Sequence, residues 1–393
     1  MDLSPVSVNQ WDSENWSKLP PEALQTLTLT LSIPINANIY VRQLKGAMTN
    51  EVYQCSWDIA AQYCEGSDIN AKGDKEEDTQ RFKGDKSRNA VLVRVYGKGV
   101  ENFFDREDEI RTFEAISNAG QGPRLLGLFA TGRIEEFLHA RTLTPQDLRH
   151  PNVSAMIAVK LREFHQLPIG GEHAPQIWKR LRDWLNEAIN ICSGENLAEF
   201  GLHNIRNEIE ELENKSSTLN SEVGFCHNDL QYGNILMDNK DGSLTFIDYE
   251  YAAYNPVAYD LANHFCEMTA DYHTDSPHVL DFSKYPDLQE RQRFIREYLR
   301  SSDADVNQCQ VEKLSSEVDF YGSTSHLLWG LWGLISHHVN GIDFNYIEYA
   351  RQRFRKFHLS KAIYKFFGVD CLELDTRRHT LRFDDNDPKE GHT

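Results

Sequence analysis

A polar stretch between Phe225 and Tyr251 has the residue types and spacing that phosphoryl transfer needs. It reads FCHNDLQYGNILMDNKDGSLTFIDYEY and places His227, Asp229 and Asn234 in the pattern H-x-D-x-x-x-x-N. Asp248 follows at the end of a later apolar run. In phosphoryl transfer one Asp receives the proton of the acceptor hydroxyl, while an Asn and a second Asp hold Mg²⁺ on the nucleotide phosphates. The spacing therefore indicates a phosphotransferase loop.

The residue types suit that chemistry, although each also has an ordinary structural reading. Mg²⁺ takes oxygen ligands and keeps several waters, so one amide and one carboxylate suffice beside the phosphates. A hydroxyl nucleophile gains from a carboxylate that is placed to take its proton. Asp and Asn are also common in turns, and this alternative holds more easily for any one of these residues than for all four together.

The residues around the polar stretch predict a loop followed by a β-hairpin. Short apolar runs at 223–226, 235–237 and 244–247 bracket the loop, with a turn between the last two. Asp248 then falls where the second hairpin strand ends. His227 is expected to orient the loop rather than to transfer protons.

Polar residues farther along the chain are expected to have structural roles. Asp260, Asn263 and His264 follow the hairpin and are predicted to anchor the loop by hydrogen bonds. Neither Cys nor carboxylate spacing near His326 and the pair 337–338 supports a zinc site, so a helix surface is expected for these histidines.

Composition and charge limit the classes of function. The 393 residues are 40% hydrophobic and 26% charged, which is ordinary for a globular protein with one large core or two lobes. The net charge of −19 argues against nucleic acid or an anionic membrane as a partner. The seven Cys form no CxxC pair, and neither a targeting segment nor a membrane-length apolar run is evident. We therefore expect a soluble cytoplasmic protein.

The first third of the chain is predicted to contain strands and few helices. After an N-terminal arm over 1–20, the expected elements are a helix over 21–31, strands over 39–44, 51–57 and 90–96, a helix over 101–118, and strands over 124–129 and 133–138. The turn at 45–50 has the shape of a phosphate-covering loop, but a plain hairpin turn fits it as well. The charged segment 64–89 is predicted to be a disordered insertion.

From Thr142 onward the apolar pattern becomes helical. Amphipathic helices are expected near 153–164, 177–192 and 197–212, and a mixed helical region extends to Phe367. The last residues, 370–393, are mostly charged and read as a tail. The predicted domains are therefore a nucleotide-binding lobe over 21–138, a second lobe over 139–369, and the tail.

Three segments resemble the choline/ethanolamine kinase family. They read FCHNDLQYGNIL, FIDYEYAAYNPVAYDLANHFCE and SHLLWGLWGLI, with weaker matches at LKGAMTNEVYQ, VLVRVYG, GPRLLG and GRIEEF. The resemblance covers about residues 38–357 apart from the insertion, and plant-type choline kinases are the most similar. It implies an α+β, protein-kinase-like two-lobed fold with a small β-rich N-lobe and a larger, mainly helical C-lobe. The implied activity is ATP-dependent phosphorylation of a small amino alcohol.

The resemblance also implies roles for individual residues. Asp229 matches the family's catalytic base, and Asn234 and Asp248 match its Mg²⁺ positions. Ala47 stands where family members often carry a second glycine. The positions that match the nucleotide-binding lobe and the connector between lobes are Arg94, Glu109, Glu136, Arg141, Gln231 and Asp248. Arg94 is expected on a strand, where Glu109 could pair with it; an Arg on the solvent face of an edge strand is the alternative.

Choline suits the aromatic residues of the second half. A trimethylammonium group has no N–H to donate, so aromatic faces and nearby carboxylates must hold it. Trp329 and Trp332 lie three residues apart, so their rings share a helix face, and Gly330 and Gly333 would allow close packing there. On spacing alone such a pair is more often core. The resemblance instead assigns the substrate pocket to Tyr251, Glu267, Tyr272, Trp329, Trp332 and Phe344, and Tyr254 is a further candidate.

The expected reaction is phosphorylation of the choline hydroxyl, the first step toward phosphatidylcholine. The run Gln231–Asn234 and the Cys before Glu267 favour choline over ethanolamine within the resemblance. Ethanolamine kinase is the alternative, followed by an aminoglycoside-type phosphotransferase and a catalytically dead scaffold. The expected cofactor is Mg²⁺, and the expected partners are ATP and choline, without nucleic acid or stable membrane insertion. Family members are often dimers, so a homodimer is compatible with the resemblance.

Overall fold

The computed structural model describes residues 19–33, 38–44, 50–58, 89–97, 103, 105–300 and 305–367, of which 38, 58, 89 and 362–367 are described by their backbone alone. The predicted arm up to residue 18, the turn at 45–49, most of the insertion and the charged tail lie outside these residues. The chain divides into two compact units, one formed by residues 1–100 and 122–139, the other by 101–121 and 140–393.

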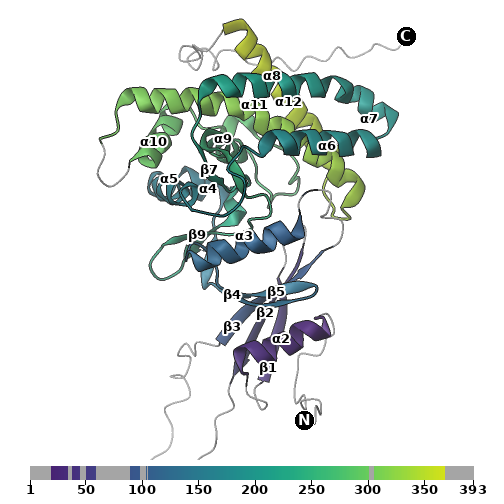
Figure 1. The fold of residues 1–393 in the computed structure, drawn as a ribbon, viewed down its shortest axis with the longest axis vertical. Helices are drawn as coiled ribbons and strands as arrows, with labels where there is room; N and C mark the ends of the chain where they lie inside the picture. Colours follow the sequence, from purple (N-terminus) through teal and green to yellow (C-terminus); the bar gives the residue numbers. More distant parts are fainter. Residues whose placement is uncertain are drawn as a thin grey trace, which may run out of the picture. The chain divides into compact units, whose positions relative to one another are not determined.

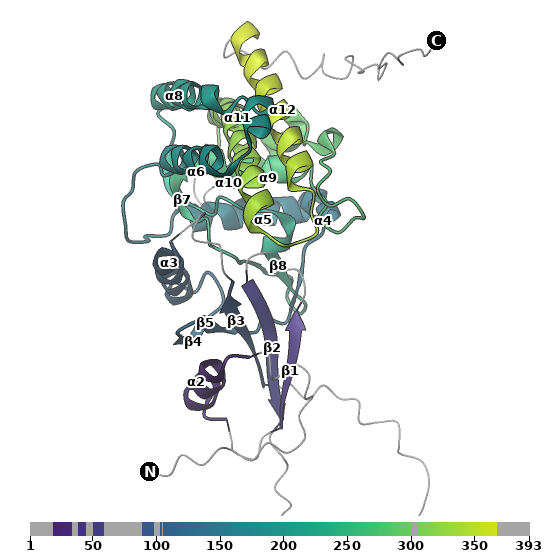
Figure 2. The same cartoon turned by 90° about the vertical axis from the view of Figure 1, so that its right-hand side faces the viewer.

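The first unit is built on an antiparallel five-stranded sheet (Figure 1). The strand order is β1-β2-β3-β5-β4, and every neighbouring pair is antiparallel. The strands are β1 (Asn38–Leu44), β2 (Asn50–Asp58), β3 (Asn89–Tyr96), β4 (Leu125–Phe129) and β5 (Gly132–Glu136). Helix α2 (Pro21–Leu31) packs against β4 and β5 (Figure 2).

Alternating residues explain how this sheet obtains a core. In β3, Val91 and Val93 are buried, and they belong to one apolar cluster with Ala23 and Leu27 of α2 and Ile134 of β5. Successive side chains of a strand point to opposite faces, so this set covers one face of the sheet. The predicted β-rich first unit is therefore confirmed.

The second unit is mostly helical, as predicted. Its helices are α3 (Arg106–Asn118), α4 (Pro145–Arg149), α5 (Pro151–His165), α6 (Ile177–Ile191), α7 (Gly194–Glu199), α8 (Leu202–Leu219), α9 (Val257–Glu267), α10 (Leu288–Leu299), α11 (Gln308–Val339) and α12 (Tyr346–Phe367), with the 3-10 turns η2 (Tyr232–Asn234) and η3 (Phe282–Lys284). The predicted helix over 101–118 begins at Arg106, because Asp105 caps it by accepting two backbone N–H groups. This helix groups with the second unit, whereas its sequence position suggested the first lobe.

Two small sheets complete the second unit. Strand β7 (Val223–Cys226) pairs antiparallel with β10 (Ala253–Pro256). Strands β6 (Ala140–Thr142), β8 (Ile235–Asp238) and β9 (Leu244–Phe246) form a three-stranded sheet in the order β6-β8-β9. The predicted loop and hairpin are confirmed, because β8 and β9 pair antiparallel and β7 precedes the loop.

Helix α11 is the central helix of the second unit and packs against α6, α9, α10 and α12 (Figure 1). It runs for 32 residues, and the stretch from 323 to 336 is buried on all sides, which its apolar sequence permits. Among the helices that the structure describes, none is long and apolar enough to cross a membrane. His326 lies on this buried stretch and is 2% exposed, so the expectation of a surface position for it was wrong.

Glycines allow α11 and α12 to approach closely, as the sequence suggested. A Cβ on Gly330 would lie 2.8 Å from the Phe354 ring, and one on Gly333 would lie 3.1 Å from the Cβ of Ala350. Both distances are too short for ordinary packing, and Phe354 is itself buried.

We therefore expect Gly330→Leu to lower the free energy of unfolding by about 1–3 kcal/mol, because overpacking forces the two helices apart. Gly322→Leu is the matched control on the same helix, since a Cβ there would meet nothing within 4 Å. Chemical denaturation of both variants measures the difference. Equal stability of the two would contradict close packing at Gly330.

Candidate active site

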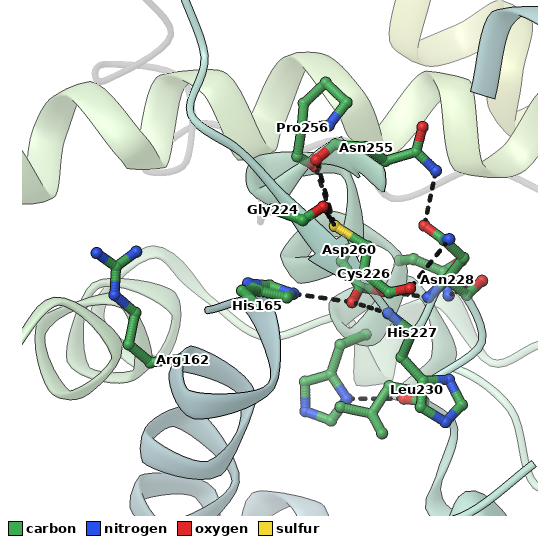
Figure 3. Close-up of polar contacts among 12 residues, drawn as sticks. Arg162, His165, Gly224, Cys226, His227, Asn228, Leu230, Asn255, Pro256 and Asp260 are labelled. Atoms are coloured by element: carbon green, nitrogen blue, oxygen red, sulfur yellow. Dashed lines mark hydrogen bonds and ion pairs between the residues drawn. The ribbon is translucent and has the colours of Figure 1, made fainter. Parts of the chain in front are cut away.

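Asp260 on α9 holds the start of the loop that follows β7 (Figure 3). Its Oδ2 accepts the backbone N–H of His227 and its Oδ1 accepts that of Asn228, each at 2.8 Å. Asn228 has φ of 65°, a left-handed conformation that Asn tolerates better than most residues. His165 also contacts Oδ2, at 2.9 Å, and its hydrogen bond helps to hold the pKa of the fully buried Asp260 below its ordinary value despite burial.

Two more residues of α9 fasten the same loop. The Asn263 amide donates to the carbonyl of Asn228 at 3.2 Å, and His264 Nδ1 lies 2.9 Å from the carbonyl of Leu230. A carbonyl only accepts, so His264 carries its proton on Nδ1. The structure therefore confirms that Asp260, Asn263 and His264 anchor the loop.

Asn228 has a central role in the loop that was not predicted from the sequence. Its side-chain amide donates to the carbonyl of Tyr251 at 2.8 Å, and its Oδ1 accepts from the Asn255 amide at 2.9 Å. The bond to Asn255, drawn in Figure 3, ties the loop to β10, and the bond to Tyr251 ties it to the segment before β10. The available signal in the sequence was an Asn next to Asp229. Asn tolerates the left-handed backbone conformation, and its amide can both donate and accept hydrogen bonds.

His165, Cys226 and Asp260 bring possible metal-ligand atoms within 4.8 Å of one another. Their hydrogen bonds account for this cluster without a metal. Both Asp260 oxygens accept backbone N–H groups, and the Cys226 thiol lies 3.4 Å from the carbonyl of Asn255. Burial, with the nearby charge of Asp260, raises the pKa of Cys226 well above its ordinary value and keeps the thiol protonated.

Asp229 and Asn234 are in direct contact. The Asn234 amide donates to Oδ2 of Asp229 at 2.9 Å and to its backbone carbonyl at 2.8 Å. Gln231 begins the η2 turn: its Oε1 accepts the Gly233 N–H at 2.6 Å, and its amide donates to Asn234 Oδ1 at 3.3 Å. Asn234 is thus held with its amide toward Asp229, and Gln231 orients it.

His227 links the loop to the strand that precedes Asp248. Its Nδ1 accepts the N–H of Asp229 at 3.3 Å, so its other nitrogen carries the proton and donates to the carbonyl of Ile247 at 2.9 Å. The backbone N–H of Ile247 in turn donates to the carbonyl of Asn234 at 3.0 Å. Burial lowers the pKa of His227, so a neutral, orienting imidazole is the form that these contacts require.

Asp229 lies among other carboxylates. Burial, followed by the negative charges of Glu267, Asp248 and Glu250, raises its pKa well above the ordinary value for Asp. Asp248 has φ of 68°, a left-handed conformation that non-glycine residues adopt rarely but that Asp tolerates better than most. Three negative side chains that raise the pKa of Asp229 make its surroundings favourable to cations.

Aromatic side chains form a cluster next to this loop. Tyr251 lies 5.5 Å from Trp329 and Trp329 lies 5.6 Å from Trp332, measured between ring centroids and with edge-to-face geometry. The Trp332 indole N–H donates to the Tyr251 hydroxyl at 3.1 Å. The Trp329 indole N–H donates to the Asn263 side chain at 2.7 Å, so the aromatic cluster and the loop share an anchor.

Further aromatic rings extend this cluster. Phe344 stands 4.8 Å from Tyr346 and 5.6 Å from Tyr349, and both tyrosines lie within 6 Å of Trp332. Phe103 is 6.3 Å from Trp332. The sequence analysis missed Tyr346, Tyr349 and Phe103, whose only signal is that they are aromatic. Tyr272 stacks at 6.0 Å on Tyr232 of the η2 turn and donates its hydroxyl to Glu267 Oε2 at 2.7 Å.

In the first unit, the residues predicted to bind nucleotide lie on the neighbouring strands β3 and β5, with Arg94 opposite Arg133 and Glu136 at the other end of the pair, opposite Val91. Arg94 is 7% exposed and donates to Glu135 at 2.9 Å, and Arg133 donates to the same carboxylate at 2.7 Å. Although burial opposes it, the charges of Arg94 and Arg133 hold the pKa of Glu135 below its ordinary value. Arg94 is therefore not on a solvent face. Glu136 ends β5 and accepts from Arg124 at 3.2 Å.

The four other residues predicted to bind nucleotide belong to the second unit: Gln231 and Asp248, described above, and Glu109 and Arg141. Glu109 is buried on α3 and accepts from Arg106 at 3.1 Å, and its pairing with Arg94 stays a prediction. Arg141 donates to both oxygens of Asp147, at 2.7 and 3.1 Å, and its hydrogen bond lowers the pKa of Asp147 to about 2. Asp147 also completes the capping box of α4, so Arg141 supports a helix start in addition to any contact with nucleotide.

A sheet-rich unit, a helical unit and the H-x-D-x-x-x-x-N loop together define a phosphotransferase with the protein-kinase-like fold. The family model described as choline/ethanolamine kinase matches residues 41–358. The chain belongs to the choline/ethanolamine kinase family.

Individual relatives agree with this family. The chain is 51% identical to the probable choline kinase 3 of Arabidopsis thaliana over 324 residues, which cover 82% of this chain and 87% of that protein. It is 35% identical to the probable ethanolamine kinase of the same plant over 280 residues, 70% of this chain and 73% of that one. The crystal structure of choline kinase from Cryptosporidium parvum Iowa II matches with a TM-score of 0.67 and 26% identity, covering 85% of this chain and 92% of that one.

Proposed function

We propose that this protein is a choline kinase, which transfers the γ-phosphoryl group of ATP to the hydroxyl of choline. The observation that carries the proposal is the edge-to-face cluster of Tyr251, Trp329 and Trp332, which lies beside a group of carboxylates around Asp229. Aromatic faces and negative charge recognise a quaternary ammonium group, which can donate no hydrogen bond. The higher identity to the plant choline kinase than to the plant ethanolamine kinase supports the same substrate.

The donor set of the loop fits magnesium. Asn234 offers an amide oxygen and Asp248 a carboxylate, and Mg²⁺ prefers oxygen ligands with several waters or phosphate oxygens completing its shell. Soft ligands are absent from this pair, which argues against zinc or copper. Bound there, the cation would neutralise charge on the nucleotide phosphates.

In the proposed reaction Asp229 accepts the proton of the choline hydroxyl as the oxygen attacks the γ-phosphorus. The carboxylate is held for this task by the Asn234 amide, and the backbone of its loop is held by Asp260. Catalysis then comes mostly from positioning and from stabilisation of charge, as in other phosphoryl transfers. Glu267, Tyr272 and Phe344 are proposed to complete the choline pocket, and Arg94, Glu109, Glu136, Arg141 and Gln231 to contribute to nucleotide binding.

The proposal is tested by measuring ADP release from Mg-ATP by the purified protein with choline, ethanolamine or an aminoglycoside as acceptor. A marked preference for choline is the expected result. Preference for ethanolamine would keep the catalytic residues and reject the substrate. ATP consumption without a preference for either amino alcohol would contradict recognition of the choline trimethylammonium group by the aromatic cluster. Omission of Mg²⁺ is expected to abolish turnover.

Trp332→Ala is expected to raise the choline KM by about 2- to 30-fold, the effect of losing one cation–π contact. The ATP KM should change far less, because nucleotide is proposed to contact other residues. Trp332→Phe is the matched control: it loses the same hydrogen bond to Tyr251 but keeps an aromatic face, so its choline KM should rise less. Equal increases in both KM values would point to a general loss of structure.

A cytoplasmic location and a role at the first step toward phosphatidylcholine belong to the same proposal. The location is supported by the cysteines: Cys55, Cys192, Cys226, Cys266 and Cys309 are all free thiols.

A further inference from the structure

Glu267 and Arg353 form an ion pair that is closed to solvent. Glu267 is 2% exposed and Arg353 is fully buried, and Arg353 Nη2 donates to Glu267 Oε1 at 2.5 Å. The other carboxylate oxygen accepts the Tyr272 hydroxyl at 2.7 Å. Each oxygen of Glu267 therefore has its own donor, one from α12 and one from the segment after α9.

Stability alone does not account for this pair. Removing two charges from water costs about as much as their attraction returns, and well-packed apolar residues often serve a fold equally well. The pair does, however, order the aromatic cluster. Tyr272 is held through Glu267, and the Arg353 guanidinium lies 5.0 Å from the ring centroid of Tyr349, which contacts Trp332.

His326 on α11 contacts the other terminal nitrogen of the Arg353 guanidinium. Its Nδ1 lies 3.3 Å from Arg353 Nη1, and since Arg only donates, Nδ1 must be the acceptor. The ring proton then resides on Nε2, which faces the Cys266 sulfur at 3.6 Å. Burial, with the charges of Arg353 and Lys356, lowers the pKa of His326 well below its ordinary value, so the ring stays neutral and able to accept.

We propose that Arg353 is a positioning residue for substrate recognition: with His326 as its acceptor, it fixes the Glu267 carboxylate so that the charge and direction of that group suit the substrate's ammonium. This role rests on the proposed function, and it adds Arg353 of α12, with His326 of α11, to the residues that determine substrate specificity. Arg353 does not itself touch the substrate. It acts through Glu267, and this distinguishes it from a residue that only stabilises the fold.

Arg353→Lys tests the inference while keeping the buried charge. An ammonium lacks the planar fork whose two arms reach His326 and Glu267, so it cannot hold both groups in their present geometry. We expect the choline KM to rise about tenfold, the usual effect of losing a hydrogen bond to a charged group. The ATP KM should stay within about twofold, because the change acts on one substrate only. Arg351→Lys is the matched control: Arg351 lies on the same helix and pairs with exposed Glu199 and Glu348, so it should change neither constant.

The neutral isostere 3,3-dimethylbutan-1-ol separates positioning of charge from loss of shape. It has the outline of choline without the positive charge. Arg353→Lys should lower kcat/KM for choline more than for the isostere, so that the ratio of the two falls. The inference would be overturned if Arg353→Lys left the ratio of kcat/KM for choline to kcat/KM for the isostere unchanged. It would also be overturned if Arg353→Lys and Arg351→Lys had the same choline KM. A wild-type protein without activity on choline would instead reject the proposed function.

Two further comparisons keep the test decisive if Arg353→Lys is poorly folded. His326→Gln keeps an acceptor for Arg353 and should resemble the wild type, whereas His326→Leu removes it and should raise the choline KM about threefold. In a Glu267→Gln background, Arg353→Lys should add less than about twofold, because its target carboxylate is gone. Equal behaviour of the two His326 variants, or additive effects of Glu267 and Arg353, would contradict the inference.

Discussion

Asp229→Asn is expected to lower kcat with choline by about 10²- to 10⁴-fold, the usual contribution of a positioned general base. The amide has the shape of the carboxylate and can still accept the Asn234 hydrogen bond, but it cannot take a proton from the substrate hydroxyl. ATP binding should stay measurable, because the proposed nucleotide and metal contacts belong to other residues. Initial rates and ATP affinity, measured on the same preparation, check both parts.

Asp238→Asn is the control for this substitution. Asp238 ends β8 and accepts the backbone N–H groups of Lys240 and Asp241 at the hairpin turn, so the same chemical change is made in the same segment without touching the loop. Its turnover should equal that of the wild type. Near-normal turnover of Asp229→Asn would remove Asp229 from the mechanism.

Asp260→Asn is expected to lower both turnover and stability, although Asp260 touches no substrate in the proposed reaction. Its two oxygens accept consecutive backbone N–H groups of the loop, and an amide would place an NH₂ donor against one of them. A buried donor without an acceptor costs about 1–3 kcal/mol of unfolding free energy. The resulting shift of Asp229 should lower kcat about 100-fold, since small misplacements of reacting groups have effects of that size.

The two effects of Asp260→Asn can be measured separately. Denaturation gives the stability, and initial rates at temperatures where the variant is fully folded give kcat. Asp241→Asn, an exposed turn residue that accepts from the Ser243 N–H, is the control and should change neither. A stable variant with unchanged turnover would show that the loop keeps its geometry without this carboxylate.

The loop and its anchors were predictable because their information is local. The pattern from His227 to Asn234 places all of its characteristic residues within one short loop. The apolar runs of the strands on either side indicate where that loop begins and ends. Asp260, Asn263 and His264 follow on the next helix at a spacing that places them on the loop side. The sequence therefore predicted this part of the site from about forty consecutive residues.

The Glu267–Arg353 pair was not predictable in this way. Residues 349–357 of α12 read YARQRFRKF, and the three arginines at 351, 353 and 355 look alike in sequence. Only the packing of α9, α11 and α12 decides that Arg353 is buried while Arg351 remains exposed. The same reason explains His326, which was expected on a helix surface and is buried beside Arg353.

Arg141 illustrates a local signal that was overlooked. Thr144 and Asp147 have the spacing of a capping box. Arg141, three residues before Thr144, supplies the cation that neutralises Asp147. The sequence thus contained a structural reason for an arginine at this position, beside the nucleotide role that the family resemblance suggested.

Helix α9 fixes the separation between two residues of the proposed site, Asp229 and Glu267. All eleven of its residues are buried, so it cannot bend or shift without disturbing the core. Its residues Asp260, Asn263 and His264 hold the loop that carries Asp229, and its last residue is Glu267. Asp229, which is proposed to take the proton, and Glu267, which is proposed to face the ammonium, are therefore both positioned by α9. We expect the fixed separation of these two residues to select amino alcohols by the number of carbons between hydroxyl and nitrogen, and not only by the charge and size of the ammonium group.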